Sequence, residues 1–341
     1  MPDAIVIGGG QAGLAAAYAL RQGGLQPLVL EAGTEPVGSW PLYYDSLKLF
    51  SPAGYSSLPG RAFPGDPRRY PHRDEVIDYL RDYAAHLDAD IRTGQRVASI
   101  EHDGEFAVRA ADEFTAPIVV AATGGFGHPH RPALPGLESF AGKVLHARDY
   151  REPGPFAGQR IVIVGAGNTA VQIGAELAEH ATVTLATRKP VGFALQRPLG
   201  LDLQFWFTVT GVGFVTIASR YRNPPRVPVL DTGIYRRAIR SGKPAQRRMF
   251  TRVDEDAVTW SDGVREPVDT IILATGYRPD ISYLPDGAVD EDGLPAQHKG
   301  LSTTHPGLGF VGLEWQRGLL SASLRGVGRD ARYVVRRLTR R

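Results

Sequence analysis

The chain has 341 residues, which is enough for two domains of ordinary size. Hydrophobic residues make up 43% and charged residues 22% of the sequence, as in soluble globular proteins, and the formal net charge is only +3. The absence of cysteine excludes thiolate metal sites and any electron transfer through a cysteine pair. The C-terminal arginines are not interleaved with a series of aromatic residues, so no nucleic-acid partner is expected, and no metal site is predicted.

A glycine-rich loop follows the apolar run 4–7, and an apolar-periodic helix follows the loop. Glycines at these positions allow a tight turn and a close approach of a pyrophosphate, which binds at the helix N-terminus. Because the strand, the loop and the helix occur together, the segment predicts a dinucleotide site. The expected cofactor-binding residues are Gly8, Gly10, Gln11, Ala12 and Gly13.

A second loop of the same kind follows the apolar run 161–164, again with a helical pattern behind it. Each half of the chain then closes on an apolar strand that ends in Thr-Gly, at 123–124 and at 275–276. The halves repeat these features at nearly the same spacing, which indicates two related nucleotide-binding domains. The expected cofactor-binding residues of the second set are Gly165, Gly167, Asn168, Thr169, Ala170, Thr275 and Gly276, and Thr123 joins the first set.

The residues after each domain's second strand distinguish the two ligands. Glu31 follows the run 27–30, where a carboxylate accepts hydrogen bonds from ribose hydroxyls and repels a 2′-phosphate, which suits FAD or NAD. The corresponding run 183–186 leads into Arg188 and Lys189, and a guanidinium can bind a 2′-phosphate through two hydrogen bonds. This pattern favours NADPH, with Arg188 as the stronger candidate; a solvated charged turn is the alternative.

These features predict an α/β protein with two Rossmann-like dinucleotide-binding domains, arranged as in two-domain flavoproteins of the glutathione-reductase type. Residues 1–155 and 277–341 are expected to form an FAD-binding domain, and residues 156–276 an NADPH-binding domain inserted into it. Helical periodicity over 73–87 and a hairpin signal at Asp103-Gly104 complete the expected elements.

The longest apolar stretch, 203–219, contains polar residues and two glycines, so it is too short and too broken to span a membrane. We expect a buried helix or a wall of the substrate pocket there, and a membrane-surface patch stays an alternative. The first strand begins by residue 4 and no signal peptide is expected before it, so the predicted location is the cytoplasm. The sequence leaves the oligomeric state open, with a homodimer among the options.

Between the halves lies a segment that resembles the signature of flavin-containing monooxygenases, Phe-x-Gly-x-x-x-His-x-x-x-Tyr/Phe-Lys/Arg. With the two loops, the chain resembles the class B flavin-dependent monooxygenases over nearly its whole length, in their compact bacterial form. Baeyer–Villiger relatives end this motif with Trp-Pro, so the Tyr-Arg of this chain favours oxygenation of a heteroatom. The histidine is expected to hold the domains together and not to act as an acid or base. The matching positions are Phe140, Gly142, His146, Tyr150 and Arg151.

The resemblance implies that FAD and NADPH bind together and that hydride passes from NADPH to the flavin. The reduced flavin then reacts with O2 to give a C4a-hydroperoxide, which a soft nitrogen, sulfur or similar atom of a small-molecule substrate attacks. Two alternatives stay open. One is an NAD(P)H dehydrogenase or oxidase that reduces a quinone or O2 without oxygen insertion. The other is a regulatory flavoprotein that senses NADPH for a transport system.

The resemblance also points to residues near the flavin. Relatives carry an asparagine in the loop that corresponds to 47–52, and this chain has none, so a serine or a lysine of the loop is expected to donate in its place. A turn at 38–40 resembles the relatives' flavin-contacting turn, with core packing as an equal alternative for its tryptophan. The region around 316 closes over the flavin ring in relatives. The expected catalytic donors are Ser51 and Lys48, and the expected cofactor contacts are Gly38, Trp40, Val97 and Gln316.

Overall fold

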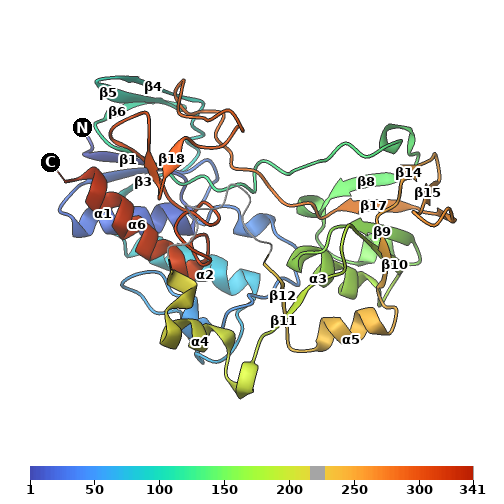
Figure 1. Ribbon diagram of the computed structural model, residues 1–341. Helices are drawn as coiled ribbons and strands as arrows, with labels where there is room; N and C mark the ends of the chain where they lie inside the picture. The colour runs from blue at the N-terminus through green and yellow to red at the C-terminus, as the bar shows by residue number, and fades with distance from the viewer. Residues whose placement is uncertain (216–226, 341) are drawn as a thin grey trace.

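The structure is a computed structural model that describes residues 1–215 and 227–340. Two largely parallel sheets form the cores of two domains, and two segments of chain cross between them (Figure 1). The first domain contains both ends of the described chain, and the second is inserted between its two parts. The α/β class and the two-domain arrangement are those that the sequence predicts.

The first sheet has central strands that are entirely buried and an antiparallel edge. Strands covered on both faces are apolar throughout, which explains the uninterrupted runs at 4–7 and 27–30. In sheet order the strands are β18 (Gln297–His298), β19 (Leu301–Ser302), β20 (Leu308–Phe310), β7 (Val119–Ala121), β1 (Ala4–Ile7), β2 (Pro27–Leu30) and β3 (Asp90–Arg92).

Helices cover one face of this sheet and a small antiparallel sheet covers the other. Ala4 and Val6 of β1 pack with the helices, whereas Ile5 and Ile7 pack with the small sheet. The helix predicted over 73–87 and the predicted hairpin are both present. The covering elements are α1 (Gln11–Gln22), α2 (Arg73–Ala85), α6 (Leu324–Leu338), β4 (Ser99–Asp103), β5 (Glu105–Arg109) and β6 (Glu113–Ala116).

The second domain repeats this plan. Its strands β10, β9 and β17 lie side by side in the order that β2, β1 and β7 have in the first. The sheet consists of β13 (Ala245–Arg248), β10 (Thr182–Thr187), β9 (Arg160–Val164), β17 (Thr270–Leu273) and β8 (Lys143–His146). It is covered by α3 (Asn168–Leu177) and α5 (Ile234–Arg240) and by the small sheet of β14 (Arg252–Val253), β15 (Ala257–Thr259) and β16 (Arg265–Pro267).

The predicted start of the second domain at residue 156 is wrong. Strand β8 pairs in parallel with β17, so residues from about 143 onward already belong to the second sheet. Tyr150 and Phe156 also lie in the core of that domain. The monooxygenase-like signature is therefore part of the second domain and not a connection that precedes it.

The long apolar stretch forms an arm with a partly exposed helix, so the predicted buried helix is also wrong. The arm leaves the second domain through β11 (Phe193–Leu195) and β12 (Val229–Asp231), and its helix α4 (Leu203–Thr210) lies below the first domain in Figure 1. Only Gln204 of α4 is buried, because the helix touches the first domain through one side alone. Arg325 of α6 donates to the carbonyl oxygen of Gln204 at 2.8 Å. The part of the stretch from 216 to 219 lies outside the described residues.

Two segments, 124–130 and 276–280, carry the chain between the domains and run antiparallel to each other. The Arg278 amide donates to the His128 carbonyl and the His130 amide to the Gly276 carbonyl, both at 2.9 Å. Thr123 and Thr275, just after β7 and β17, each donate to the other crossing segment, so the carboxyl ends of both sheets lie at this connection. Both glycine loops contact these ends, and the region between the two domains here is called the seam. Ligands of open α/β sheets bind at such ends.

Candidate dinucleotide and flavin site

The first glycine loop is shaped by contacts that leave no room for side chains. Gly8 has φ +104°, and a Cβ there would lie 2.7 Å from the Ala122 carbonyl oxygen. A Cβ on Gly13 would lie 1.7 Å from the Gly8 carbonyl oxygen, so α1 packs directly on the loop. Gly10, the N-cap of α1, provides no side-chain cap. The N–H groups of the first helical turn are therefore available to a pyrophosphate.

The second loop has the same construction. Gly165 has φ +152°, and a Cβ there would lie 2.4 Å from the Ala274 carbonyl oxygen, the counterpart of Ala122. Gly167 caps α3 without a side chain, and no atom lies within 4 Å of a Cβ placed on it. Asn168 begins α3, and its Oδ1 is buried without a partner. A buried acceptor without a donor is costly in a finished protein, so this loop fits a bound ligand that supplies one.

Glu31 occupies the position expected of a ribose acceptor. Its Oε2 accepts from the Gly9 amide at 2.5 Å and its Oε1 from the Gly33 amide at 2.7 Å, which fixes the carboxylate at the end of β2. A carboxylate can accept about four hydrogen bonds, so capacity for hydroxyl donors remains. The Gln95 amide donates to the Glu31 carbonyl oxygen, and the side-chain Oε1 of Gln95 is buried without a partner. Val97 lies two residues further on and is partly buried.

Arg188 and Lys189 are exposed at the carboxyl end of β10, where the sequence places the 2′-phosphate. The structure adds Arg248, because Thr187 of β10 stands opposite it in the parallel register with β13. Arg278 and Arg188 both lie close enough to His130 to lower its pKa, after burial as the main cause. The sequence analysis missed Arg248 and Arg278, since strand register and the crossing of the two connections are not visible in local motifs.

On the other side of the first loop, three segments meet where the flavin ring is expected. Gly38 has φ +58°, and a Cβ on it would lie 2.8 Å from the Gly10 Cα, so the turn lies against the loop. Trp40 Nε1 donates to Gln11 Oε1 at 3.1 Å, and Gln11 Nε2 donates to the Ala322 carbonyl oxygen at 2.7 Å. Gln11 thus joins the turn to the C-terminal loop across the helix N-terminus.

Gln316 has a structural role in the turn that it belongs to, and its flavin contact stays a prediction. It is only 3% exposed. Its Nε2 donates to the Phe310 carbonyl oxygen at 2.8 Å, and its Oε1 accepts from the Leu313 amide at 3.3 Å. The clamped turn holds Trp315 at φ +55°, a conformation that is strained for a bulky residue. Burial of the Tyr43 hydroxyl, helped by the nearby Glu314 carboxylate, raises the pKa of that phenol to about 12.

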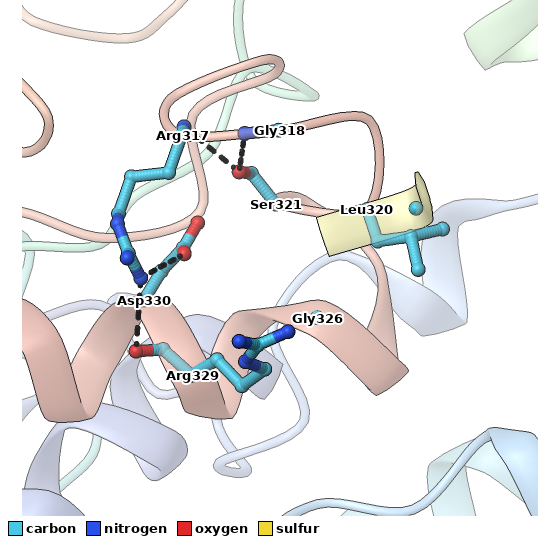
Figure 2. Close-up of a pocket in the computed structure, with 8 residues that line it drawn as sticks. Arg317, Gly318, Leu320, Ser321, Gly326, Arg329 and Asp330 are labelled. Atoms are coloured by element: carbon cyan, nitrogen blue, oxygen red, sulfur yellow. Dashed lines mark hydrogen bonds and ion pairs between the residues drawn. The ribbon is translucent and has the colours of Figure 1, made fainter. Parts of the chain in front are cut away.

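The loop that follows is fixed to α6 by a buried cluster (Figure 2). Ser321 Oγ accepts from the Arg317 and Gly318 amides at 3.0 Å, and Arg317 Nη1 forms an ion pair with Asp330 at 3.1 Å. Burial raises the pKa of Asp330, and Arg317 opposes that effect. The hollow beside these side chains has a volume of about 20 Å³, which is far too small for a substrate. The cluster therefore shapes the loop and binds no reactant.

The loop expected to hold the catalytic donors lies in the seam between the domains. Leu47 packs on the core of the second domain and Leu49 on that of the first, with Lys48 between them. No hydrogen bond or ion pair engages the Lys48 side chain within residues 1–215 and 227–340. Ser51 Oγ lies 2.9 Å from Ser56 Oγ, which itself donates to the Pro52 carbonyl oxygen at 2.9 Å. The Ser51 proton is thus directed to Ser56, which favours Lys48 as the free donor.

Comparison with known proteins decides the family. Residues 5–199 match the pyridine nucleotide-disulphide oxidoreductase family. The chain belongs to this family. An uncharacterized CzcO-like oxidoreductase of Geobacillus kaustophilus is 34% identical, covering 98% of this chain and 97% of the relative. The rice indole-3-pyruvate monooxygenase YUCCA1 is 31% identical, covering 95% and 89%.

Among solved structures, the flavin-containing monooxygenase from Stenotrophomonas maltophilia aligns with a TM-score of 0.87 and 35% identity, over 99% of this chain and 98% of that one. This member of the oxidoreductase family is a flavin-dependent monooxygenase that uses FAD and NADPH. It performs no chemistry through a disulphide of its own, because it has no cysteine. No helix in the described ranges is long and apolar enough to cross a membrane.

The signature histidine of this oxidoreductase lies at the end of β8 in the second domain and contacts the start of the crossing segment 276–280, so its predicted role in holding the domains together stays a prediction. His146 is fully buried, its Nδ1 accepts from the Arg148 amide at 3.1 Å, and its Nε2 lies 3.1 Å from the Gly276 carbonyl oxygen. These contacts require a neutral ring with the proton on Nε2. Thr123 and Thr275 act similarly, since each donates to the opposite crossing segment, at the carbonyl oxygens of Asp280 and His130.

We expect His146 to make the monooxygenase less stable in mild acid. Burial lowers the pKa of His146, so the unfolded chain binds a proton more readily than the folded protein. The neutral His146 therefore favours the folded state fully above the ordinary histidine pKa of about 6.5. This contribution to the free energy of unfolding is lost as the pH falls below that value. Melting temperatures from about pH 7.5 to about pH 5.5 should fall more steeply for wild type than for His146→Asn, which cannot titrate. Parallel curves would contradict this account.

Proposed function

We propose that the first domain holds FAD, that the second holds NADPH, and that the enzyme transfers one oxygen atom of O2 to a soft nitrogen or sulfur atom of a small substrate. One observation carries the assignment of the domains. Two loops of the same construction face one seam, but one is followed by the fixed carboxylate of Glu31 and the other by the exposed Arg188. A carboxylate rejects a 2′-phosphate and a guanidinium binds it.

Bound FAD supplies the redox chemistry and the activation of oxygen, and the protein supplies position and a dry site. The first turn of α1 binds the FAD pyrophosphate and Glu31 its ribose. The clamped turn around Gln316 and the Gly38–Trp40 turn enclose the ring side of the site. The first turn of α3 binds the NADPH pyrophosphate, with Thr169 and Ala170 in that turn.

Support for a heteroatom substrate comes from the end of the signature. Tyr150 is fully buried, and its hydroxyl donates to Glu176 at 2.8 Å. Tyr150 is therefore a core residue, and the end of the motif supports a heteroatom substrate through its resemblance to heteroatom-oxygenating relatives and not through a contact with substrate. The S-allyl-L-cysteine S-oxygenase of Allium sativum shares the fold at 22% identity. We propose that the enzyme acts in the cytoplasm, where NADPH is supplied.

The test is incorporation of oxygen from isotopically labelled O2. The purified enzyme, NADPH and a panel of thioethers, amines and ketones are incubated, and products are identified by mass. Labelled sulfoxides or N-oxides support the proposal. Labelled esters from ketones would refute the heteroatom assignment. NADPH oxidation that yields only hydrogen peroxide with every substrate would show an oxidase.

Lys48 is proposed to take the place of the asparagine that relatives carry in the seam loop. Lys48→Met should leave reduction of the flavin by NADPH nearly unchanged and raise the fraction of O2 released as peroxide several-fold. Loss of one preorganised donor costs about 2.7–4 kcal/mol where a developing charge depends on it fully, so a partial loss of coupling is expected. Stopped-flow absorbance measures reduction, and a peroxide assay measures coupling.

Ser51→Ala is the matched variant of the same loop. The Ser51 hydroxyl is bonded to Ser56, so we expect little change in coupling from its removal. If Ser51→Ala uncouples the enzyme and Lys48→Met does not, the assignment of the donor to Lys48 is wrong. In that case Ser51 would be the donor that replaces the asparagine.

A further inference from the structure

The arm between β11 and β12 carries an unusual amount of exposed apolar surface. More than half of the large hydrophobic side chains exposed in the described ranges lie within 195–234. Isolated apolar residues on a surface need no explanation, but a concentration of them marks a contact site. The members used below, called the arm patch, are Leu195, Leu199, Leu201, Val209, Val212 and Ile234.

Leu199 is the most exposed member of the arm patch. It is 87% exposed and has φ +54°, within the turn Pro198–Gly200. A large side chain in this conformation is strained even when it is buried, and the described residues leave Leu199 with little packing to compensate. The next residue, Gly200, also has positive φ, which bends the chain sharply and leaves Leu199 projecting.

The members of the arm patch belong to one continuous unit. Trp206 Nε1 donates to the Pro198 carbonyl oxygen at 3.0 Å, so α4 packs on the turn. Residue 209 is three positions further along the same helix and lies on the same face as Trp206. Leu195 stands opposite Asp231 in the β11–β12 pair, and Asp231 accepts from the Tyr235 amide at the start of α5. In Figure 1, α4 and α5 lie on the lower side of the molecule, with β11 and β12 between them.

Cations lie beside this apolar surface at its α5 end. Arg237 and Arg240 are exposed on α5, near Ile234, and Lys243 follows the helix. The two acidic residues of the arm's described part are already engaged. Asp231 is buried, and Asp202 accepts from Tyr70 at 2.5 Å. The unit therefore presents apolar side chains with unneutralised positive charge beside them.

We propose that the arm patch docks on the surface of a membrane that contains anionic phospholipids. Leu199 and its neighbours enter the interface between headgroups and acyl chains, and the α5 cations face lipid phosphates. Stable attachment to a membrane surface requires two signals together, an apolar insertion and a basic patch, and the arm has both. A second copy of the chain fits less well, because a symmetric contact would bring like charges together.

The docked arm would lie next to the reaction site. Gln196 Nε2, between Leu195 and the turn, donates to the Phe50 carbonyl oxygen at 3.2 Å in the seam loop. A substrate dissolved in the bilayer would thus enter from the side on which the arm binds. This placement goes beyond the proposed oxygenation, and its test does not depend on that activity.

The experiment is co-sedimentation of the FAD-loaded enzyme with vesicles of phosphatidylcholine alone and of phosphatidylcholine mixed with phosphatidylglycerol. We expect binding to the mixed vesicles only, and weaker binding as salt rises. Leu199→Asn should reduce binding roughly tenfold, since burial of one leucine is lost; asparagine tolerates positive φ, so the turn should persist. Leu294→Asn, at an exposed leucine of the first domain, is the matched control and should bind as wild type does.

A second pair of variants tests the role of charge. We expect Arg237→Glu combined with Arg240→Glu to bind the mixed vesicles more than about tenfold more weakly than wild type. The matched control is Arg109→Glu with Arg252→Glu, two exposed cations on the small antiparallel sheets of the two domains. Bound flavin absorbance confirms that each variant is folded. Equal binding to both vesicle types, or no binding, would overturn the proposal. So would light scattering that shows a wild-type dimer converted to a monomer by Leu199→Asn.

Discussion

Gly13→Ala will yield a protein that binds FAD about 10- to 100-fold more weakly than wild type, because overpacking at a close contact costs about 1–3 kcal/mol. The added Cβ would lie 1.7 Å from the Gly8 carbonyl oxygen, so α1 must move away from the loop. That shift displaces the N–H groups that bind the pyrophosphate. Flavin absorbance after desalting, followed by titration with FAD, measures the effect.

The same substitution in the other loop is the control. Gly167→Ala adds a Cβ with no atom within 4 Å, at φ −91°, which any residue adopts. It should keep its FAD in full and remain folded. A Gly13→Ala protein that is as yellow as wild type would mean that α1 can shift without loss of the site. The second loop suggests how this could happen, since it carries Ala170 where the first has Gly13.

The local parts of both sites follow from the sequence because their physics is local. A buried strand, a turn that needs glycine and an uncapped helix occupy about twenty consecutive residues, so their pattern survives without knowledge of the fold. The acid after β2 and the cations after β10 follow for the same reason. Repetition of the pattern in both halves also predicts that one domain is inserted into the other.

Contacts between residues far apart in the sequence cannot be predicted from local sequence patterns. Lys143–His146 has only two apolar residues, Val144 and Leu145, and only the register with β17 shows to which sheet it belongs. Gln316 and Ser51 are polar residues near the expected flavin, and only the structure shows that each already forms a hydrogen bond within the chain, to Phe310 and to Ser56. The stretch 203–219 is apolar enough for a core, yet the tertiary structure leaves much of its described part on the surface.

Arg188→Ala should lower kcat/KM for NADPH by roughly tenfold to over a hundredfold and leave kcat/KM for NADH nearly unchanged. Arg188 is exposed at the end of β10 and forms no ion pair within the described part of the chain, so its guanidinium is available to the 2′-phosphate. Charge-assisted hydrogen bonds of this kind contribute about 1.5–3 kcal/mol. Steady-state kinetics with both nucleotides gives the ratio directly.

Three further variants identify which part of the cationic edge recognises the phosphate. Arg188→Lys keeps the charge but loses the paired hydrogen bonds, so an intermediate preference for NADPH is expected. Lys189→Ala should have a smaller effect than Arg188→Ala. If Arg188→Ala leaves the ratio unchanged while Arg248→Ala abolishes the preference, the phosphate lies over β13, and Arg188 is the solvated charge that the sequence also allowed.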